Sequence, residues 1–321
     1  MAMTMKLLGC GGAGINIVKK FLGKSGEGFA DLDICMLDTS RSNMPKDINE
    51  DNIYLFDGLD GSGKLRASNY SVISERAREI VQRVKPGDVT VVVHSASGGS
   101  GSVLAPVLIS ELLKREVMVM VVAVGSSDSR IEVENTIKTL KSYAIISQKN
   151  ERPINMIYAE NTREMGRGAV DKAIETNIIL ASLFFSGQNR ELDKSDLRNF
   201  LDYHKVTSFA PKLTMVDFCS GGVSLERDQA LVSAVSLTDE NASTAIDQPL
   251  EYQATGFITT AVKEAVKVDM PIHMVTVANY FGNVIERLEK QLRVIDEARS
   301  AVIEKSIVSN QENYTDTGLV L

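Results

Sequence analysis

Residues 9–14 read Gly-Cys-Gly-Gly-Ala-Gly, directly after a short apolar run at 6–8 and directly before residues 15–22, whose apolar positions have helical spacing. This order predicts a strand, a glycine turn and a helix. Such a turn binds anions, because glycine permits a tight bend, backbone N–H groups can approach a phosphate, and the helix start adds a positive dipole. Residues 9–14, the first glycine loop, therefore predict a phosphate site without specifying the nucleotide.

A dinucleotide-binding fold would also satisfy this pattern. The glycines fit the spacing G-x-G-x-x-G, and Asp38 stands near the end of the second predicted strand, where such folds place an acid for the ribose. This interpretation predicts an oxidoreductase that uses a nicotinamide cofactor.

A second glycine-rich stretch separates the two interpretations. Residues 95–102, the second glycine loop, read Ser-Ala-Ser-Gly-Gly-Ser-Gly-Ser between an apolar strand at 89–93 and a helix-like segment at 103–113. Two such loops at the ends of parallel strands would cradle a di- or triphosphate from two sides, which a dinucleotide fold does not need. The motif G-x-x-x-x-G-K-[ST] is absent, so backbone amides, hydroxyls and a metal ion would have to meet the phosphate charge.

Further apolar runs alternate with helix-like segments through the first half of the chain. Strand-like runs at 34–37, 117–124 and 154–158 accompany the helix-like segments at 74–84 and 103–113. This alternation predicts an α/β fold whose parallel sheet is covered by helices on both faces.

After residue 162 the pattern changes. A long, largely apolar helix is expected at 169–185, then strands at 213–219, 231–237, 252–258 and 272–278, and an amphipathic helix at 280–307 that must dock on something. We therefore predict a nucleotide-binding domain at 1–168, a central helix and the loop after it at 169–200, a smaller strand-rich domain at 201–278, a C-terminal helix at 279–309 and a flexible tail at 310–321.

Composition narrows the class of protein. The chain has 321 residues, 44% hydrophobic and 24% charged, with a net charge of -7 and a pI near 5.2. An acidic chain is not expected to bind nucleic acid or an anionic membrane directly. No apolar run is long enough to span a bilayer and no secretory signal is evident, so we expect the cytoplasm. The three cysteines and three histidines are scattered, which gives no zinc site and no assigned metal ligand.

The two glycine loops resemble those of the tubulin/FtsZ superfamily. Residues 9–16 are similar to its first nucleotide loop, including the closing Asn16, and residues 97–102 resemble the signature G-G-G-T-G-[ST]-G. Ser97 replaces the first signature glycine and Val103 the last, which indicates a divergent branch. The core S-G-G-S-G-S-V-L, the pair Asn161-Thr162, the stretch L-D-K-S-D at 192–196 and the short tail resemble the phage tubulins, over nearly the whole chain.

The resemblance implies GTP or GDP with Mg²⁺ at the two loops. Residues 59–64, which we call the sensor loop, would sense the terminal phosphate; Asp128 would contact the ribose, Asn161 the guanine edge and Asp171 the base again. Asp128 could equally be a turn residue, and Asp171 a solvent-facing acid at a helix start. The candidate nucleotide-binding residues are Gly11, Gly12, Ala13, Asn16, Asp38, Gly61, Ser97, Gly98, Gly99, Ser100, Gly101, Ser102, Asp128, Asn161 and Asp171.

Asp193 and Asp196 stand where the family carries the loop N-x-D-x-x-D, with Glu191 in place of its asparagine. The resemblance implies that these two acids enter the nucleotide site of the next subunit and orient a water there, so hydrolysis requires polymerisation. The residues alone also fit an exposed turn, with Asp193 or Ser195 as the N-cap of a helix.

The resemblance thus implies a GTPase whose subunits polymerise head to tail. Its C-terminal tail would contact the neighbouring subunit through Asp316 and residues 319–321. The filaments would position phage DNA in the cytoplasm of an infected bacterium. A plasmid-partitioning tubulin, a nicotinamide-dependent oxidoreductase and a scaffold that polymerises without hydrolysis are the alternatives.

Overall fold

The computed structural model of this protein describes residues 2–304 except 47, 57, 60, 163, 240–245, 247 and 249, and it describes no side chains for 301–304. The predicted tail at 310–321 and residue Asp60 of the sensor loop therefore lie outside the described residues.

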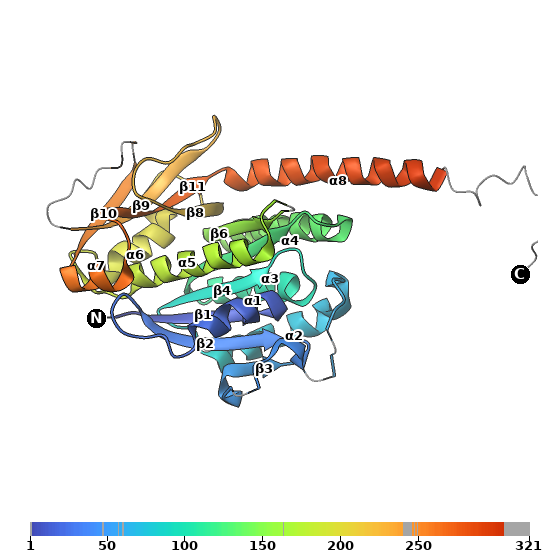
Figure 1. The fold of residues 1–321 in the computed structure, drawn as a ribbon, viewed down its shortest axis with the longest axis horizontal. Helices are drawn as coiled ribbons and strands as arrows, with labels where there is room; N and C mark the ends of the chain where they lie inside the picture. The colour runs from blue at the N-terminus through green and yellow to red at the C-terminus, as the bar shows by residue number, and fades with distance from the viewer. Residues whose placement is uncertain are drawn as a thin grey trace, which may run out of the picture.

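Within these residues one sheet of eleven strands runs through the molecule, in the order β3-β2-β1-β4-β5-β6-β8-β11-β9-β10-β7 (Figure 1). The strands are β1 (Thr4–Cys10), β2 (Asp31–Asp38), β3 (Ile53–Leu55), β4 (Val89–Ser95), β5 (Met118–Ser126), β6 (Ile154–Asn161), β7 (Asn189–Arg190), β8 (Leu213–Cys219), β9 (Ala230–Thr238), β10 (Tyr252–Ile258) and β11 (Ile272–Ala278). Neighbours from β3 to β8 pair parallel, whereas β11 pairs antiparallel with β8 and β9. The predicted α/β fold with a parallel sheet is confirmed.

Helices cover both faces of the sheet (Figure 1). One buried apolar cluster includes side chains of α1 (Gly11–Val18), α5 (Arg167–Phe185), α6 (Lys194–Leu201) and α7 (Thr260–Val266). The other includes side chains of α2 (Tyr70–Val84), α3 (Ser100–Leu113), α4 (Arg130–Asn150) and α8 (Tyr280–Glu304). Each face of the central parallel strands is thus buried, as their near-continuous apolar runs predict. No helix among the described residues has both the length and the apolar character to cross a membrane.

The C-terminal helix α8 packs its apolar face against α4, as expected for an amphipathic helix. Phe281 and Leu288 are buried in the second cluster, and ion pairs join Glu289 to Lys141 and Asp296 to Arg130, both at 2.6 Å. Figure 1 shows the far end of α8 extending beyond the body of the molecule.

The strand-rich region continues the first sheet, because β8 pairs parallel with β6. This junction is short: Ile154, Asn155 and Met156 pair with Leu213, Thr214 and Met215. The region is strand-rich as expected, and the domain boundaries proposed from the sequence remain predictions.

Candidate functional site

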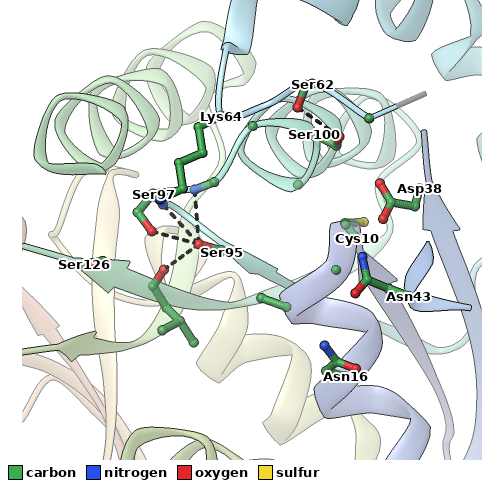
Figure 2. Close-up of a pocket in the computed structure, with 18 of the residues that line it drawn as sticks. Cys10, Asn16, Asp38, Asn43, Ser62, Lys64, Ser95, Ser97, Ser100 and Ser126 are labelled. Carbon is green, nitrogen blue, oxygen red and sulfur yellow. Dashed lines mark hydrogen bonds between the residues drawn. The ribbon is translucent and has the colours of Figure 1, made fainter. Parts of the chain in front are cut away.

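A cavity of about 700 Å³ opens where β1, β2, β4, β5 and β6 end and their loops lead into helices (Figure 2). In an open α/β sheet, ligands bind at this carboxyl edge. The predicted residues that line the cavity are Gly11, Gly12, Ala13, Asn16, Asp38, Gly61, Ser97, Gly98, Gly99, Ser100, Gly101, Asn161 and Asp171. The fold therefore gathers most of the predicted nucleotide-binding residues around one space.

Four predicted residues lie outside this lining. Ser102 is fully buried and donates its hydroxyl to the carbonyls of Gly98 at 2.7 Å and Gly99 at 2.9 Å, so it braces the second glycine loop from behind. Asp128 is exposed on the turn after β5, and the acid that lines the cavity from this segment is Glu132. Asp193 and Asp196 belong to a different edge of the sheet, described below.

The two glycine loops pack backbone against backbone, which explains their composition. Gly11 has a φ of +69°, and a Cβ added there would lie 2.8 Å from the amide nitrogen of Gly101. A Cβ added to Gly101 would lie 2.5 Å from the carbonyl oxygen of Cys10. Any larger residue at either position would push the loops apart. The loops can therefore face one ligand from two sides.

The helices that follow the loops begin without side-chain caps. Neither Cys10, the N-cap of α1, nor Gly99, the N-cap of α3, accepts a hydrogen bond from its helix through a side chain, and neither helix has an acid in its first turn. The first N–H groups of a helix have no partner within the helix. Here those groups and the two helix dipoles are available to an anion in the cavity.

Ser95 holds the second glycine loop in shape (Figure 2). Its hydroxyl oxygen accepts from the backbone nitrogens of Ser97 at 3.3 Å and Gly98 at 3.1 Å, and it lies 3.3 Å from the carbonyl oxygen of Val124 on the neighbouring strand. A local side-chain bond of this kind replaces the ladder contacts that the backbone loses when the strand ends.

Asp38 lies at the end of β2 beside a group of hydroxyls. Its carboxylate accepts from the backbone nitrogen of Thr39 at 2.7 Å, and the hydroxyl of Thr39 lies 2.6 Å from that of Ser100. Burial raises the pKa of Asp38, although hydrogen bonds from Thr39, Asn43 and Ser100 oppose this rise. Carboxylate and hydroxyl oxygens are ligands that Mg²⁺ accepts, commonly alongside phosphates and water. This donor set fits a magnesium ion carried by a nucleotide.

Asn161 lines the cavity from the end of β6, and Asp171 and Arg167 line it from α5. The side-chain oxygen of Asn161 is buried and has no hydrogen-bond partner among the described residues. Because a buried acceptor without a partner is costly, such an atom indicates a missing donor. A guanine edge carries suitable N–H donors.

Lys64 and Glu132 were not predicted from the sequence as cavity residues. Lys64 ends the sensor loop, and Glu132 lies in the first turn of α4; they form an ion pair of 2.8 Å within the lining. Sixty-eight positions separate them, and no short motif connects them. The order S-x-x-E at Ser129 and Glu132 resembles the start signal of a helix, which was the one available clue.

Asp193 and Asp196 form a capping box at the start of α6. Asp193 accepts from the backbone nitrogens of Ser195 at 2.7 Å and Asp196 at 3.0 Å, while Asp196 accepts from the backbone nitrogen of Asp193 at 3.0 Å. Tyr252 on β10 donates its hydroxyl to the other carboxylate oxygen of Asp196 at 3.0 Å. The cap expected from the residues alone is therefore present, and it orients both acids.

These two acids, the α6 acids, lie at the amino edge of the parallel strands. Lys194 pairs with Asp88, the residue immediately before β4, and Asp88 also accepts from the backbone nitrogen of Thr4 at 3.0 Å. The cavity lies at the other end of β4. A strand rises about 3.3 Å per residue, so roughly 20 Å separate the two edges. The α6 acids cannot reach the cavity of their own subunit.

Comparison with known proteins gives a consistent result. Residues 4–151 match the model described as "Tubulin/FtsZ family, GTPase domain". The "Phage tubulin-like protein" of Pseudomonas phage phiKZ is 25% identical over 325 residues, covering 97% of this chain and 96% of the relative. The solved "Protofilament of TubZ from Bacteriophage PhiKZ" is 25% identical with a TM-score of 0.80, covering 99% of this chain and 95% of that one.

A further solved structure, "Structure of the phage tubulin PhuZ(SeMet)-GDP", is 20% identical with a TM-score of 0.82 and covers 99% of both chains, which shows the shared fold. The family model covers the part of the chain that holds both glycine loops, the sensor loop and the first turn of α4. The similarity to phage tubulin-like proteins extends over nearly the full length. The chain thus resembles the tubulin/FtsZ family, with residues 4–151 matching its GTPase domain.

Proposed function

We propose that this protein is a filament-forming GTPase whose subunits stack head to tail, so that the α6 acids of one subunit complete the nucleotide site of the next. The observation that carries the proposal is the separation of the cavity and the α6 acids at opposite edges of one sheet. A contact between unlike edges does not close on itself and therefore produces an open filament. Relatives solved as a protofilament and as the "PhuZ201 filament" support this arrangement.

The cavity suits a guanine nucleotide. The phosphates would lie against the uncapped starts of α1 and α3, and the unpartnered oxygen of Asn161 would accept a hydrogen bond from the base. Asp171 is a candidate second base contact. The GDP of the solved PhuZ structure supports this choice of nucleotide.

Magnesium would accompany the phosphates. Asp38, directly or through water, would hold it together with the phosphate oxygens, and the ion would neutralise charge that develops during phosphoryl transfer. Among the described residues, no group of three or more His, Cys, Asp or Glu side chains is arranged to hold a separate metal ion. The protein's share of the site is thus small, as is usual for magnesium.

Hydrolysis would begin when the next subunit brings its α6 acids to the terminal phosphoryl. Asp193 and Asp196 would orient a water for in-line attack, giving GDP and inorganic phosphate, by positioning and electrostatics rather than covalent chemistry. The capping box and the hydroxyl of Tyr252 hold the two carboxylates in place for that encounter. A filament would therefore hydrolyse GTP and free subunits would not.

We further propose that the filaments position phage DNA in the cytoplasm of an infected bacterium, and that the tail at 310–321 contacts a neighbouring subunit. The similarity to a tubulin-like protein of Pseudomonas phage phiKZ supports a phage role in preference to plasmid partitioning. The family match gives the nicotinamide-dependent alternative no support.

Complementation between two inactive variants tests the shared site. Asp196→Asn removes the charge of one α6 acid, and Asn161→Ala weakens nucleotide binding. Assembly is followed by light scattering and hydrolysis by phosphate release. The GTP concentration is chosen so that it saturates Asp196→Asn but not Asn161→Ala. We expect little phosphate from either variant alone and recovery when they are mixed, because some interfaces then combine an intact cavity with intact acids. Mixed filaments without recovered phosphate release would exclude a shared site.

A further inference from the structure

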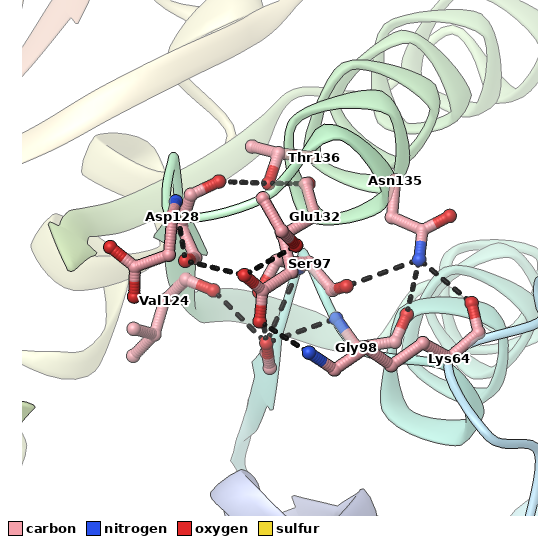
Figure 3. A network of polar contacts seen from close by, with 11 residues as sticks. Lys64, Ser97, Gly98, Val124, Asp128, Glu132, Asn135 and Thr136 are labelled. Atoms are coloured by element: carbon pink, nitrogen blue, oxygen red, sulfur yellow. Dashed lines mark hydrogen bonds and ion pairs between the residues drawn. The ribbon is translucent and has the colours of Figure 1, made fainter. Parts of the chain in front are cut away.

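Lys64 is fixed directly over the second glycine loop. A Cβ added to Gly99 would lie 3.0 Å from both the backbone nitrogen and the Cα of Lys64. The side-chain nitrogen of Asn135 donates to the carbonyl oxygens of Lys64 at 2.9 Å and Ser97 at 3.1 Å, which ties the sensor loop to the second glycine loop (Figure 3). The backbone of Lys64 is therefore anchored where phosphates are expected.

The side chain of Lys64 is much freer than its partner. Its ammonium pairs with Glu132 at 2.8 Å, yet 49% of the Lys64 side chain is exposed against 8% of Glu132. Glu132 also accepts from the hydroxyls of Ser129 at 2.9 Å and Ser126 at 3.4 Å. Because two hydroxyl donors would remain, Glu132 would keep hydrogen bonds if the lysine turned away.

Glu132 is a charged acid on the wall of the cavity. Burial raises its pKa, but the hydrogen bonds from Lys64 and Ser129, with the charge of Lys64, lower it below its ordinary value. A buried carboxylate opposes a phosphate in the same cavity unless a cation lies between them. Among the described residues the cations of the lining are Lys64 and Arg167, and Lys64 is the one that pairs with Glu132.

The backbone of Lys64 is strained for a residue with a side chain. Its φ is +65°, in the left-handed region, where glycine fits without steric cost. Gly61 and Gly63 of the same loop also have positive φ. A lysine is therefore kept at a position that glycine would fill at lower cost, which makes its side chain a candidate for a functional role.

We propose that Lys64 is a specificity-determining residue that binds the terminal phosphoryl of GTP, and that Glu132 competes with this phosphoryl for the lysine. The inference rests on the guanine-nucleotide site proposed above. The terminal phosphoryl carries more negative charge than a carboxylate, so the exposed four-carbon side chain turns toward it while Asn135 holds the backbone. When the phosphoryl leaves, Glu132 takes the lysine back. The ion pair thereby favours GTP over GDP by means of one moving side chain.

The test is the ratio of two dissociation constants, for GDP and for a non-hydrolysable GTP analogue, measured by calorimetry with Mg²⁺ at protein concentrations too low for assembly. Contacts to the base and ribose affect both nucleotides alike and cancel in the ratio. Lys64→Gly removes the ammonium and relieves the strained φ, so the variant is expected to fold. We expect its preference for the GTP analogue over GDP to fall about tenfold, the loss of one charge-assisted contact.

Glu132→Gln should act in the opposite direction. Without the competing charge, Lys64 is available to the phosphoryl, and the preference for the GTP analogue should rise by about threefold. Lys64→Arg should keep most of the wild-type ratio because it keeps the charge. Lys267→Gly is the matched control, since Lys267 also has a positive φ, +51°, but is the C-cap of α7 and does not line the cavity.

A wild-type chain that binds neither guanine nucleotide would overturn the proposed function and this inference together. A wild-type chain that binds both, with the same ratio in Lys64→Gly, would overturn this inference alone. Equal losses for both nucleotides in Lys64→Gly and Glu132→Gln would also overturn it, since the ion pair would then only fasten the sensor loop to α4.

Discussion

The two edges of the parallel strands are built differently. At the carboxyl edge, Gly11 and Gly101 bring the backbones of the two glycine loops into contact, and hydrogen bonds with Ser95 and Asn135 hold the loops in place. At the amino edge, the α6 acids lie at the start of a short helix and are held by its capping box and by Tyr252. The first edge is built from buried groups that leave N–H donors for a ligand. The second edge offers charge at the surface.

This contrast fits the two proposed roles. A ligand that must be bound tightly needs groups fixed before it arrives, which the buried edge supplies. Acids that act on another subunit must be exposed in the free subunit, because their target lies outside it. The carboxyl edge should therefore be sensitive to packing and burial, and the amino edge to the loss of single polar groups.

The largest effect is expected when low pH protonates His94, which immediately precedes the second glycine loop, because this protonation should destabilise the fold. Burial lowers the pKa of His94 from 6.5 to about 4, and its ring nitrogens contact the hydroxyl of Tyr143 at 2.8 Å and the carbonyl of Ser95 at 3.0 Å. The unfolded chain binds this proton more readily than the folded one, so the free energy of unfolding should decrease as pH falls from about 6.5 to about 4, by about 3 kcal/mol.

Urea unfolding at several pH values measures this dependence. His94→Gln should lower stability at pH 7 yet flatten the dependence between pH 6.5 and 4, because the titrating group is gone. An equally steep dependence in that variant would assign the acid sensitivity to other groups and weaken the claim that the carboxyl edge depends on a buried neutral ring.

A methyl group at the contact between the two glycine loops should come next. Gly101→Ala would place a Cβ 2.5 Å from the carbonyl oxygen of Cys10, and overpacking of this kind destabilises a fold by about 1–3 kcal/mol. The midpoint temperature of thermal unfolding and the affinity for nucleotide should both fall. Gly282→Ala on α8 is the matched control, since nothing lies within 4 Å of its added Cβ and the helix should gain slightly. Similar losses in both variants would mean that the loop contact is not special.

The smallest effect is expected at the amino edge, from Tyr252→Phe. The variant removes the hydroxyl that donates to Asp196 at 3.0 Å, and one such bond contributes about 1 kcal/mol. Phosphate release within filaments should fall by several-fold, while nucleotide affinity stays the same and the free energy of unfolding falls by no more than about 1 kcal/mol. Tyr70→Phe, on an exposed tyrosine, serves as control. A loss of stability without a loss of phosphate release would make Tyr252 a packing residue.

Much of the fold could be predicted because its strands other than β3 and β7, and the helices α2, α3, α5 and α8, carry clear apolar patterns. Helix α4 (Arg130–Asn150) was not predicted, and the reason is physical: its buried face includes Glu132, Asn135, Thr136 and Thr139. The same face also buries Val133, Ile137 and Leu140 at helical spacing, but the polar side chains between them obscure that pattern. Glu132, Asn135 and Thr139 contact the sensor loop or the second glycine loop, so the helix that was missed forms part of the site.

The candidate site divides in the same way. Backbone contacts were predictable, since the glycines of both loops identify them at known spacing. The pairing of Lys64 with Glu132 was not, because it depends on how two distant segments meet. Asp128, chosen from the sequence for the ribose, is exposed, and the buried acid one helical turn further on lines the cavity instead.

The junction of β6 with β8 has a mechanical consequence. Between other neighbouring interior strands of this sheet at least five residue pairs are in register, but between β6 and β8 there are three. Two side-chain contacts reinforce the junction: the buried ion pair of Arg152 with Asp202 at 2.7 Å, and the hydrogen bond that Asn155 donates to the carbonyl of Leu201 at 2.8 Å. A sheet under load bends most easily where the fewest ladder bonds cross. If neighbours in a row pull on a subunit, it should crease along this line, with the phosphate loops on one side and the strand-rich half on the other.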